Sequence, residues 1–581
     1  MKKFYIIIML LVIISISLFS GCDNTEKNIE KQNYDVIVVG TDPEGIAAAI
    51  STSRNGFKTL LIDKRDSIGG LFTLGWLNFL DMNYSPENEL LTRGIFESFY
   101  QQIEGVSFDV QTAERVFSEM IEKEDLIKLS LSNDLIEPIM DGNKVIGIRS
   151  AKEDVKKNNL ATYVIDATQD GDIAALSGAK FTLGQEDIGG PAHGMAVTQV
   201  FKLGGIKSDH WQKIRSYLAN DDDINTGSTH STAWGFPELY ETYNPKNSNV
   251  QMRGLNIARQ TDGCVMINAL QIFSIDPLDS KSLNKAKDIA LDELNYIIPF
   301  LQDNIPGMEN ATLLNVAPEL YVRESRHFET LYKVTIDDVL EHRDFEDKIA
   351  LGSYPVDLQG TSPGENVIII GNPAIYSIPL RATIPKEVEN IFIVSRSAGY
   401  DSLAHGSTRV VPVGMCVAEG VGQIVSNLLE NNITISDFLE NENLIDTAQK
   451  ELINYGAYLP DFDYPAKITN HPHYEGLKLL RHYGLVQGRY DNDYKLDESI
   501  RAFTFFEMYN FLNHELKWNL PVIEDDFEGY LNKEMLLNMF YLETDVTDLL
   551  KKNQIFSQID NTDKLSLGEA AMFLYEINQF D

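Results

Sequence analysis

Short apolar runs near the start of the chain are separated by a turn and an alanine-rich segment. Val36 to Val39 is a run of β-branched residues, and Thr59 to Ile62 is a second apolar run of strand length. Between them, Ile46 to Arg54 has the composition of a buried helix. A strand, a tight turn, a helix and a second strand, in this order, are typical of the first unit of a Rossmann domain.

The turn before this helix keeps two of the three small residues that dinucleotide binding favours. Gly40 can reverse the chain and Gly45 can let the helix pack on the strand, but Asp42 stands where the backbone should approach a diphosphate. Glu44 adds a second carboxylate at the positive end of the helix. Asp63 is spaced to bind a ribose hydroxyl. The alternatives are a dinucleotide-binding domain and a nucleotide fold that no longer binds nucleotide.

Further along, the apolar pattern predicts more strands and helices. Lys144 to Ser150 and Ala161 to Asp166 have the pattern of strands, whereas Ser282 to Leu301 and Gly414 to Leu429 have the pattern of helices. Residues 84–128 are predicted to be mostly helical. Strands that alternate with helices in this way predict an α/β protein.

Composition narrows the classes of function. The 581 residues are enough for two or three domains. The net charge of −37, from 49 basic and 86 acidic residues, argues against nucleic acid as a partner and against electrostatic attachment to anionic lipid. Beyond Cys22, only Cys264 and Cys416 remain, which are too few for an iron–sulfur cluster or a disulfide framework. The sequence has no metal-ligand spacing, so no metal is expected, and redox chemistry would need an organic cofactor.

The first residues predict export and a lipid anchor. Lys2 and Lys3 precede an apolar run from Phe4 to Phe19, and Ser-Gly-Cys follows, ending at Cys22. This arrangement is typical of a secretory signal peptide. The Leu-Phe-Ser-Gly-Cys order resembles a bacterial lipobox, which implies lipid on Cys22 and a protein tethered to the membrane in the cell envelope. A plain signal peptide and an uncleaved anchor are the alternatives.

Five later segments match, in order, motifs of one known family. They are residues 166–179 (DATQDGDIAALSGA), 323–326 (RESR), 349–358 (IALGSYPVDL), 376–385 (YSIPLRATIP) and 401–425 (DSLAHGSTRVVPVGMCVAEGVGQIV). Together with the opening unit they resemble a bacterial family of FAD-dependent oxidoreductases with the glutathione-reductase-like fold. The resemblance implies FAD as cofactor. Asp42 and Gln169 depart from it, because the family has glycine at both positions.

The resemblance also implies how the chain is divided. The fold class expected is α/β, with a Rossmann-type FAD-binding domain interrupted by an α+β substrate domain and followed by a small helical domain. The expected parts are a signal peptide and linker (1–33), the first part of the FAD-binding domain (34–185), the substrate domain (186–370), the closing part of the FAD-binding domain (371–430) and the helical C-terminal domain (431–581).

The C-terminal domain contains two weak repeats. Residues 471–512 resemble a degenerate S-layer homology repeat, with a helix, a glycine turn and a second helix, and residues 531–577 echo this pattern. The resemblance implies binding to a cell-wall polymer. The usual Thr-Arg-Ala-Glu signature is reduced to Ile-Arg-Ala-Phe at residues 500–503. The alternative is a helical cap without a binding role.

The closing motif supplies the strongest candidate for acid–base chemistry. His405 stands directly before a glycine–serine turn and titrates near neutral pH, so it is the expected proton carrier. The alternative is a buried histidine satisfied by backbone. Asp401 either orients His405 or caps a turn, and His193 is a lower-ranked alternative base.

The residues expected to bind FAD are Gly40, Gly45, Asp63, Lys64, Gly69, Gly70, Leu71, Asp166, Ala167, Thr168, Asp172, Gly406 and Ser407.

Arginines complete the set of candidate catalytic residues. Arg409 would place a fixed positive charge near the flavin, or would form an ion pair that holds this segment to the core. Arg381, Arg323 and Arg326 could bind an oxyanion of the substrate through a bidentate contact. Each could equally be a structural ion-pair partner, with Glu324 as an obvious acceptor.

These observations predict an exported, membrane-tethered FAD-dependent oxidoreductase that passes a hydride between a small organic substrate and flavin N5. No second glycine fingerprint is present, so a separate NAD(P)H domain is not expected. The alternative is an envelope binding protein that keeps a flavoprotein-like shell without its cofactor and uses its C-terminal repeats.

Overall fold

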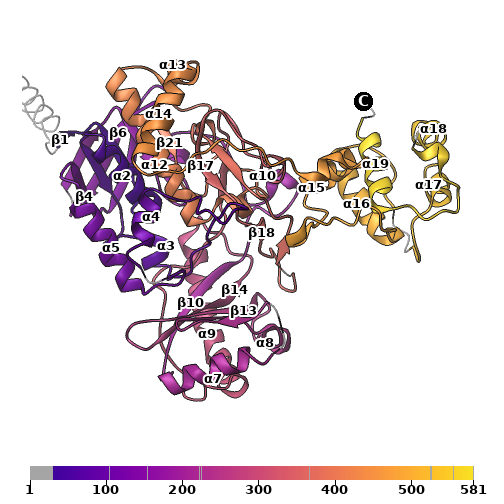
Figure 1. The fold of residues 1–581 in the computed structure, drawn as a ribbon, viewed down its shortest axis with the longest axis horizontal. Helices are drawn as coiled ribbons and strands as arrows, with labels where there is room; N and C mark the ends of the chain where they lie inside the picture. Colours follow the sequence, from indigo (N-terminus) through magenta and orange to yellow (C-terminus); the bar gives the residue numbers. More distant parts are fainter. Residues whose placement is uncertain are drawn as a thin grey trace, which may run out of the picture.

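The computed structural model describes residues 30–579 except 104, 154, 222, 224, 366, 524–526 and 554. The predicted signal peptide and Cys22 therefore lie outside the described residues. The described chain has a central body, an inserted lobe and a C-terminal helical unit that projects to one side (Figure 1). Among the described residues, no helix combines the length and apolar character needed to cross a membrane.

A five-stranded parallel sheet forms the centre of the body. Its order is β21-β8-β2-β3-β4. The strands are β2 (Val36–Val39), β3 (Thr59–Ile62), β4 (Ile127–Ser130), β8 (Tyr163–Asp166) and β21 (Ile391–Ile393). Every residue of β2, β3, β8 and β21 is buried, as expected for a parallel sheet that is covered on both faces. The bounds predicted for β2 and β3 are confirmed.

Helix α2 (Pro43–Arg54) packs against this sheet, and a longer helix packs against α2. Helix α2 connects β2 to β3, and α12 (Val411–Asn431) lies against it. Helix α2 begins earlier than predicted because proline is favoured in the first turn of a helix. The two helices approach closely, since a Cβ added at Gly422 would lie 2.6 Å from the Cβ of Ser51.

The segment 84–128 is only partly helical, contrary to the prediction. It contains α4 (Ile95–Tyr100) and α5 (Val110–Glu122), and much of the rest is loop, with isolated bridges at Tyr84–Leu90 and Phe79–Ser107.

A second, four-stranded sheet has the order β1-β7-β6-β5. Its strands are β1 (Glu30–Asn33), β5 (Leu135–Asp141), β6 (Lys144–Lys152) and β7 (Val155–Leu160).

The inserted lobe is built on a six-stranded sheet with its own apolar core. The order is β11-β12-β13-β14-β10-β15. The strands are β10 (Val197–Gly204), β11 (Gly227–Ser228), β12 (Thr232–Gly235), β13 (Val250–Arg259), β14 (Val265–Ile272) and β15 (Thr312–Val316). Its helices are α7 (Ser208–Leu218), α8 (Pro237–Thr242) and α9 (Ser280–Asn304). The helix predicted over residues 282–301 is thus the central part of α9.

Short helices and two-stranded ladders complete the central region. The helices are α3 (Gly70–Thr73), α6 (Asp172–Leu176), α10 (Ile336–Leu340) and α11 (His405–Thr408). The two-stranded ladders are β9 (Phe181–Leu183) with β16 (Arg326–Phe328), β17 (Lys348–Gly352) with β20 (Tyr376–Pro379), and β18 (Asp357–Leu358) with β19 (Ile368–Ile369).

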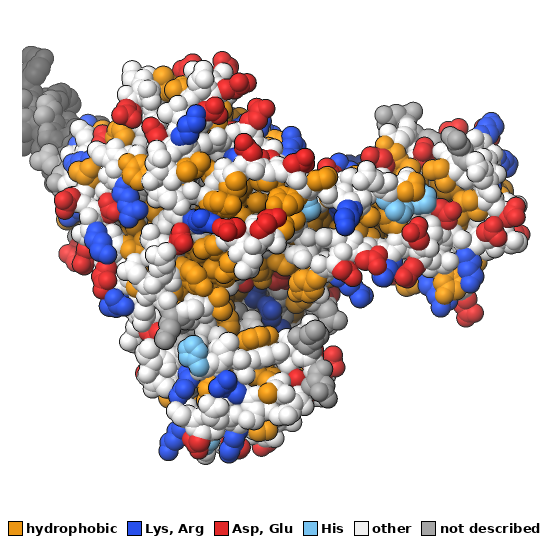
Figure 2. Space-filling model, viewed as in Figure 1, with side chains coloured by type: hydrophobic (Ala, Val, Ile, Leu, Met, Phe, Trp, Pro, Cys, Tyr) orange, Lys and Arg blue, Asp and Glu red, His pale blue; other side chains and the backbone are white. Residues whose placement is uncertain are grey.

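The C-terminal region has two parts. Helices α13 (Ile435–Leu439) and α14 (Glu442–Asn454) stay with the body, where α14 packs on α12. The projecting unit has a separate apolar core. Its helices are α15 (Tyr474–His482), α16 (Ala502–Glu515), α17 (Lys533–Met539), α18 (Thr544–Lys552) and α19 (Leu567–Ile577). Acidic side chains are spread over the body and this unit on the face seen in Figure 2, in line with the net charge.

Candidate active site

The order of the central sheet places a crevice beside β2. The chain continues from β2 to β3 and β4 on one side, whereas β8 and β21 lie on the other. Ligands of open α/β sheets bind at such a switch point, outside the carboxyl ends of the strands. A cavity of about 540 Å³ lies there, and its walls include Gly40, Asp63, Lys64, Ile136 and Thr168. The sequence-predicted residues after β2, β3 and β8 are therefore brought together.

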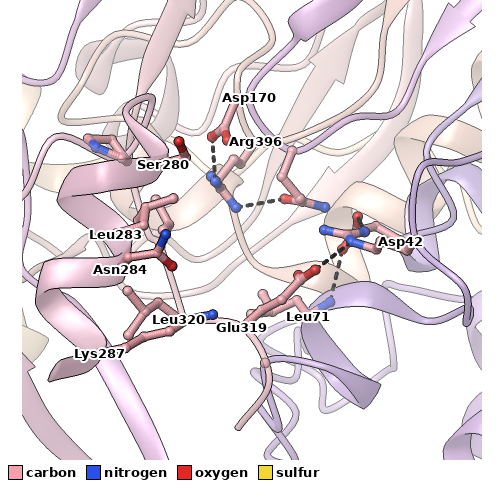
Figure 3. A pocket seen from close by; sticks show the side chains of 15 residues that line it. Asp42, Leu71, Asp170, Ser280, Leu283, Asn284, Lys287, Glu319, Leu320 and Arg396 are labelled. Atoms are coloured by element: carbon pink, nitrogen blue, oxygen red, sulfur yellow. Dashed lines mark hydrogen bonds and ion pairs between the residues drawn. The ribbon is translucent and has the colours of Figure 1, made fainter. Parts of the chain in front are cut away.

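A second cavity of about 280 Å³ adjoins the first and shares several of its residues. It lies between the body and the first turns of α9 (Figure 3). Asp42, Leu71 and Glu319 face it from one side, and Leu283, Asn284 and Lys287 from the other. The inserted lobe thus forms one wall of the crevice. We call the two cavities together the cleft.

The turn after β2 needs glycine for steric reasons. Gly40 has a φ of +103°, and a Cβ there would lie 2.7 Å from the carbonyl carbon of Ala167. A Cβ at Gly45 would lie 2.0 Å from the carbonyl oxygen of Gly40. Both glycines therefore let the turn pass close to β8 and to α2, in the roles predicted for them.

Asp63 stabilises the turn after β2 through hydrogen bonds to Thr41. Its Oδ2 accepts hydrogen bonds from the backbone N–H of Thr41 at 2.6 Å and from the Thr41 hydroxyl at 2.7 Å. Its Oδ1 accepts one bond from the N–H of Arg65 at 3.0 Å. A carboxylate oxygen can accept two bonds, so Oδ1 keeps capacity for a ribose hydroxyl.

Asp42 points into the place expected for a diphosphate. The residue is 1% exposed and directly precedes the first turn of α2. Its Oδ1 accepts a hydrogen bond from the N–H of Leu71 at 2.9 Å, and its Oδ2 forms an ion pair with Arg65. Arg65 also bonds to Glu319 at 2.9 Å, from Nε. The chain's own carboxylate therefore uses the donors that a bound anion would use.

Gln169 departs from the family pattern and is tied into a second network. Its amide nitrogen donates to Glu44 at 3.0 Å, and its oxygen accepts from Arg396 at 3.0 Å. Arg396 also pairs with Asp170 at 2.6 Å (Figure 3). Burial, and then the charge of Asp42, raise the pKa of Glu44 to about 8. Glu44 is therefore largely neutral at pH 7.

The segment after β8 is organised by Asp166. Its carboxylate accepts from the N–H of Thr168 at 3.1 Å, from the Thr168 hydroxyl at 2.6 Å and from the N–H of Ala174 at 2.8 Å. Burial raises its pKa to about 7. Asp172 instead pairs with Arg326 at 2.9 Å. The carboxylate of Asp166 is therefore engaged within its own segment, and Arg326 is an ion-pair partner of Asp172, which also lines the first cavity. Whether Asp166 and Asp172 bind FAD stays a prediction.

The closing motif forms α11, which is buried, and continues into α12. The Ser407 hydroxyl lies 2.7 Å from that of Tyr376, and Gly406 packs against β18, where an added Cβ would lie 3.1 Å from the carbonyl oxygen of Asp357. Arg409 donates to the hydroxyl of Tyr321 at 2.7 Å. None of Gly406, Ser407 and Arg409 belongs to the cleft lining.

His405 is 1% exposed and its ring lies against that of His327, with the ring centroids 4.9 Å apart. Burial, and then the charges that His327 and Arg409 can carry, lower the pKa of His405 well below its usual value. The imidazole is therefore neutral at pH 7. Asp401 does not hold His405: its carboxylate accepts from the N–H groups of Ala404 and Ile336 and so caps a turn.

The remaining arginine candidates have structural partners. Arg381 forms a two-point contact with Asp347, from Nε and from Nη2, at 2.9 Å each. Arg323 is buried, donates to the carbonyl of Ala196 at 3.0 Å and to the hydroxyl of Thr198 at 2.8 Å, and does not bond to Glu324. Arg381 is therefore a structural ion-pair partner of Asp347, which is the alternative to binding an oxyanion of the substrate.

Comparison with known proteins gives the family. The model of the family "FAD dependent oxidoreductase" matches residues 35–452. The chain belongs to this family. A segment of 114 residues is 32% identical to an NADH dehydrogenase of Bacillus subtilis (strain 168), and covers 20% of this chain and 21% of that protein. A segment of 58 residues is 45% identical to a digeranylgeranylglycerophospholipid reductase of Picrophilus torridus, and covers 10% of this chain and 14% of that protein.

Solved structures are similar at a lower level. A geranylgeranyl bacteriochlorophyll reductase-like protein from Thermoplasma acidophilum is 13% identical, with a TM-score of 0.38 over 74% of this chain and 85% of that chain. The p-nitrophenol 4-monooxygenase from Pseudomonas putida is 8% identical, with a TM-score of 0.38 over 74% and 87%. At these scores we draw no conclusion from the likeness.

The cleft fits the adenosine part of FAD, the cofactor of this family. The cavity beside Gly40 and Thr168 has an acceptor on Asp63 for a ribose hydroxyl and an apolar wall at Ile136. At the position expected for the diphosphate, however, the ligand would compete with Asp42 for the Leu71 N–H and for Arg65. FAD therefore fits once the Asp42 side chain turns away from Leu71.

Sequence reasoning missed four residues that the fold brings to the site. Arg65 follows Asp63 by two positions, so the acidic-basic run at the end of β3 could have signalled it. Glu319, Arg396 and His327 had no local signal, because long-range packing alone places them near the cleft or His405.

Proposed function

We propose that this FAD-dependent oxidoreductase passes a hydride between a small organic substrate and flavin N5. The observation that carries the proposal is the cleft at the switch point, which meets the inserted lobe at α9. On the lobe side, Leu283 and Leu320 offer apolar surface while Asn284 and Ser280 offer hydrogen-bonding groups. Such a mixture suits a small molecule that has both an apolar body and polar substituents.

FAD, when bound, would supply the hydride chemistry, and the chain would hold it and manage the proton. Gly40 and Asp63 would hold the adenosine part. Arg65 would balance the charge of the diphosphate once Asp42 has moved. His405 is the proposed proton carrier because it stands directly before the glycine–serine turn. Burial lowers the pKa of its imidazole, so it would act as a weak base at neutral pH and would not titrate there.

The test uses the purified protein and needs no substrate. We expect a visible absorbance band of bound flavin, or quenching of FAD fluorescence when FAD is added. Anaerobic mixing with a panel of alcohols, amines and unsaturated acids should then bleach the band for at least one class. A protein that stays colourless and does not quench added FAD contradicts the proposal and leaves the cofactor-less binding protein as the alternative.

We also propose that the protein is exported and lipid-anchored through Cys22. The lysine start, the apolar run and the small residues before Cys22 support this. Detergent partitioning of wild type and Cys22→Ala is the test. We expect wild type in the detergent phase and the variant in the aqueous phase, and equal partitioning would contradict the anchor.

The C-terminal unit is proposed to bind a cell-wall polymer. Its support is the repeat-like pattern of residues 471–512 and 531–577 and its position as a separate lobe (Figure 1). Sedimentation with purified cell walls should retain the full chain. The chain shortened to end at residue 465 should stay in the supernatant, and equal retention of both would contradict the proposal.

A further inference from the structure

Three metal-ligating side chains meet in the interior of the body. Glu324 and His327 lie on either side of the start of β16, and His405 begins α11. One ligand atom from each residue can be chosen so that all three lie within 4.8 Å of one another. Their exposed fractions are 1%, 0% and 1%. We call these residues the histidine cluster.

Both imidazoles of the histidine cluster have an unused nitrogen. The Nδ1 atoms of His327 and His405 are buried and have no hydrogen-bond partner among the described residues. Buried polar atoms are nearly always paired, because an unpaired one loses its hydrogen bond to water on folding. The unpaired Nδ1 of His405 leaves a lone pair for an ion, whereas His327 would coordinate through Nε2, the nitrogen that faces Glu324.

The glutamate of the cluster is held in place by its surroundings. Its Oε2 accepts from the N–H of Met195 at 2.9 Å, and a Cβ at Gly194 would lie 2.5 Å from the same oxygen. The other oxygen, Oε1, lies 3.1 Å from Nε2 of His327. Two ligands of a tetrahedral zinc ion, each at about 2.1 Å from it, would be about 3.4 Å apart. The Glu324–His327 pair is therefore already near the spacing that coordination requires.

The charges around the cluster allow a cation. Arg396 and Arg409 lie close enough to influence His405, but Arg396 pairs with Asp170, and Arg409 with Tyr321 and Asp357. Asp187 adds a second carboxylate near His327, although it also accepts from Ser402 and Lys333. Glu324 supplies the one negative charge in direct contact.

We propose that Glu324, His327 and His405 bind one divalent transition-metal ion, with zinc favoured by the ligand set. Two imidazoles and one carboxylate form the ligand set of catalytic zinc sites, which keep a fourth position open for water or substrate. The site goes beyond the oxidoreductase function proposed above. A bound ion would use a lone pair of His405, so metal content decides whether this residue is a ligand or a free base.

The test measures zinc in the full chain, purified with zinc supplied and then freed of loosely bound ions by gel filtration. We expect about one zinc ion per chain in wild type and in the control His230→Asn, whose histidine is exposed and outside the cluster. His327→Asn and Glu324→Gln should each fall to about one tenth of this value or less. Circular dichroism confirms that each variant is folded.

Cobalt substitution gives a second measurement that does not depend on any variant. Cobalt bound by two imidazoles and a carboxylate in a tetrahedral site should give visible absorption, and added zinc should remove it. The proposal is overturned if wild type holds less than about one tenth of an ion per chain, or if the cluster variants retain as much zinc as wild type. Neither result depends on flavin absorbance, so this failure is separate from failure of the proposed function.

Discussion

The opening turn and the closing motif differ in whether their buried polar side chains have hydrogen-bond or ion-pair partners. Around the opening turn, Asp42, Asp63 and Gln169 all have partners, and Arg65 and Arg396 balance the charge. Around the closing motif, the nitrogens of two adjacent histidines have no partner among the described residues. The opening region already contains an anion of its own, so a bound anion must compete with Asp42 for the Leu71 N–H and Arg65. In the closing region, a ligand would instead give the unpaired Nδ1 of His405 a partner.

The largest expected effect comes from filling the space between the turn and α2. Gly45→Ala adds a Cβ that would lie 2.0 Å from the Gly40 carbonyl oxygen, and Gly45 has no positive φ, so the cost is purely steric. We expect a loss of about 3 kcal/mol in the free energy of unfolding, measured by urea denaturation.

Gly263→Ala is the matched control for that loss. Gly263 has a φ of +82° and open space around it, so its cost should be about 1 kcal/mol of backbone strain alone. Equal losses of unfolding free energy in the two variants would mean that the turn shifts easily to admit the Cβ. The opening turn would then not be tightly packed.

The second effect concerns the closing motif. If His405 carries the proton, His405→Asn should keep the flavin spectrum and slow flavin reduction by roughly 10²-fold. Stopped-flow reduction with a substrate found by screening measures this, and His230→Asn, whose histidine is exposed, serves as control. The same preparation should be analysed for zinc, because loss of an ion and loss of a base can slow the reaction alike. An unchanged rate from mildly acidic to mildly alkaline pH would make His405 structural.

Sequence patterns succeeded where the structure is local and failed where it depends on distant parts of the chain. The strands β2 and β3 and the roles of Gly40 and Gly45 follow from neighbouring residues, because apolar runs and small residues act within one unit. Glu319 reaches Arg65 across 254 positions only because the inserted lobe folds back over the cleft.

The histidine cluster shows the same limit. The place of His405 before a glycine–serine turn singles it out, but its neighbour His327 lies on β16, which pairs with β9 in a separate ladder. No spacing in the sequence relates the two residues. The direction of Asp42 could not be predicted either, because it depends on the approach of Arg65 and of the N–H of Leu71.

The third effect is a pH dependence of stability that originates in the opening turn. The pKa of Glu44 rises from 4.5 to about 8 on folding. The folded state therefore binds the proton more tightly, so this contribution to stability is full below about pH 4.5 and is lost as the pH rises through about 8. Glu44→Gln is neutral at every pH and lacks this dependence.

Urea unfolding of both proteins at about pH 5 and about pH 9 is the measurement. We expect wild type to lose stability relative to Glu44→Gln between the two values. A constant difference between the proteins would show that Glu44 is ionised in the folded protein throughout, and that the opening turn carries a further buried charge.

The smallest expected effect tests the competition at the diphosphate directly. Asp42→Asn keeps an oxygen that can accept from Leu71 but removes the negative charge, whereas Asp42→Gly removes the whole side chain and frees both Leu71 and Arg65. One like-charge contact in a partly wet site costs about 1 kcal/mol, which is a several-fold change in affinity. We expect FAD to bind Asp42→Gly most tightly, Asp42→Asn next and wild type least, in a fluorescence titration at low salt. Added salt should narrow the differences, since it screens the repulsion.

If Asp42→Gly binds FAD no more tightly than wild type, the Asp42 carboxylate turns aside without cost when FAD binds. The opening region would then contain no anion that competes with the diphosphate, and the contrast with the closing region would not hold.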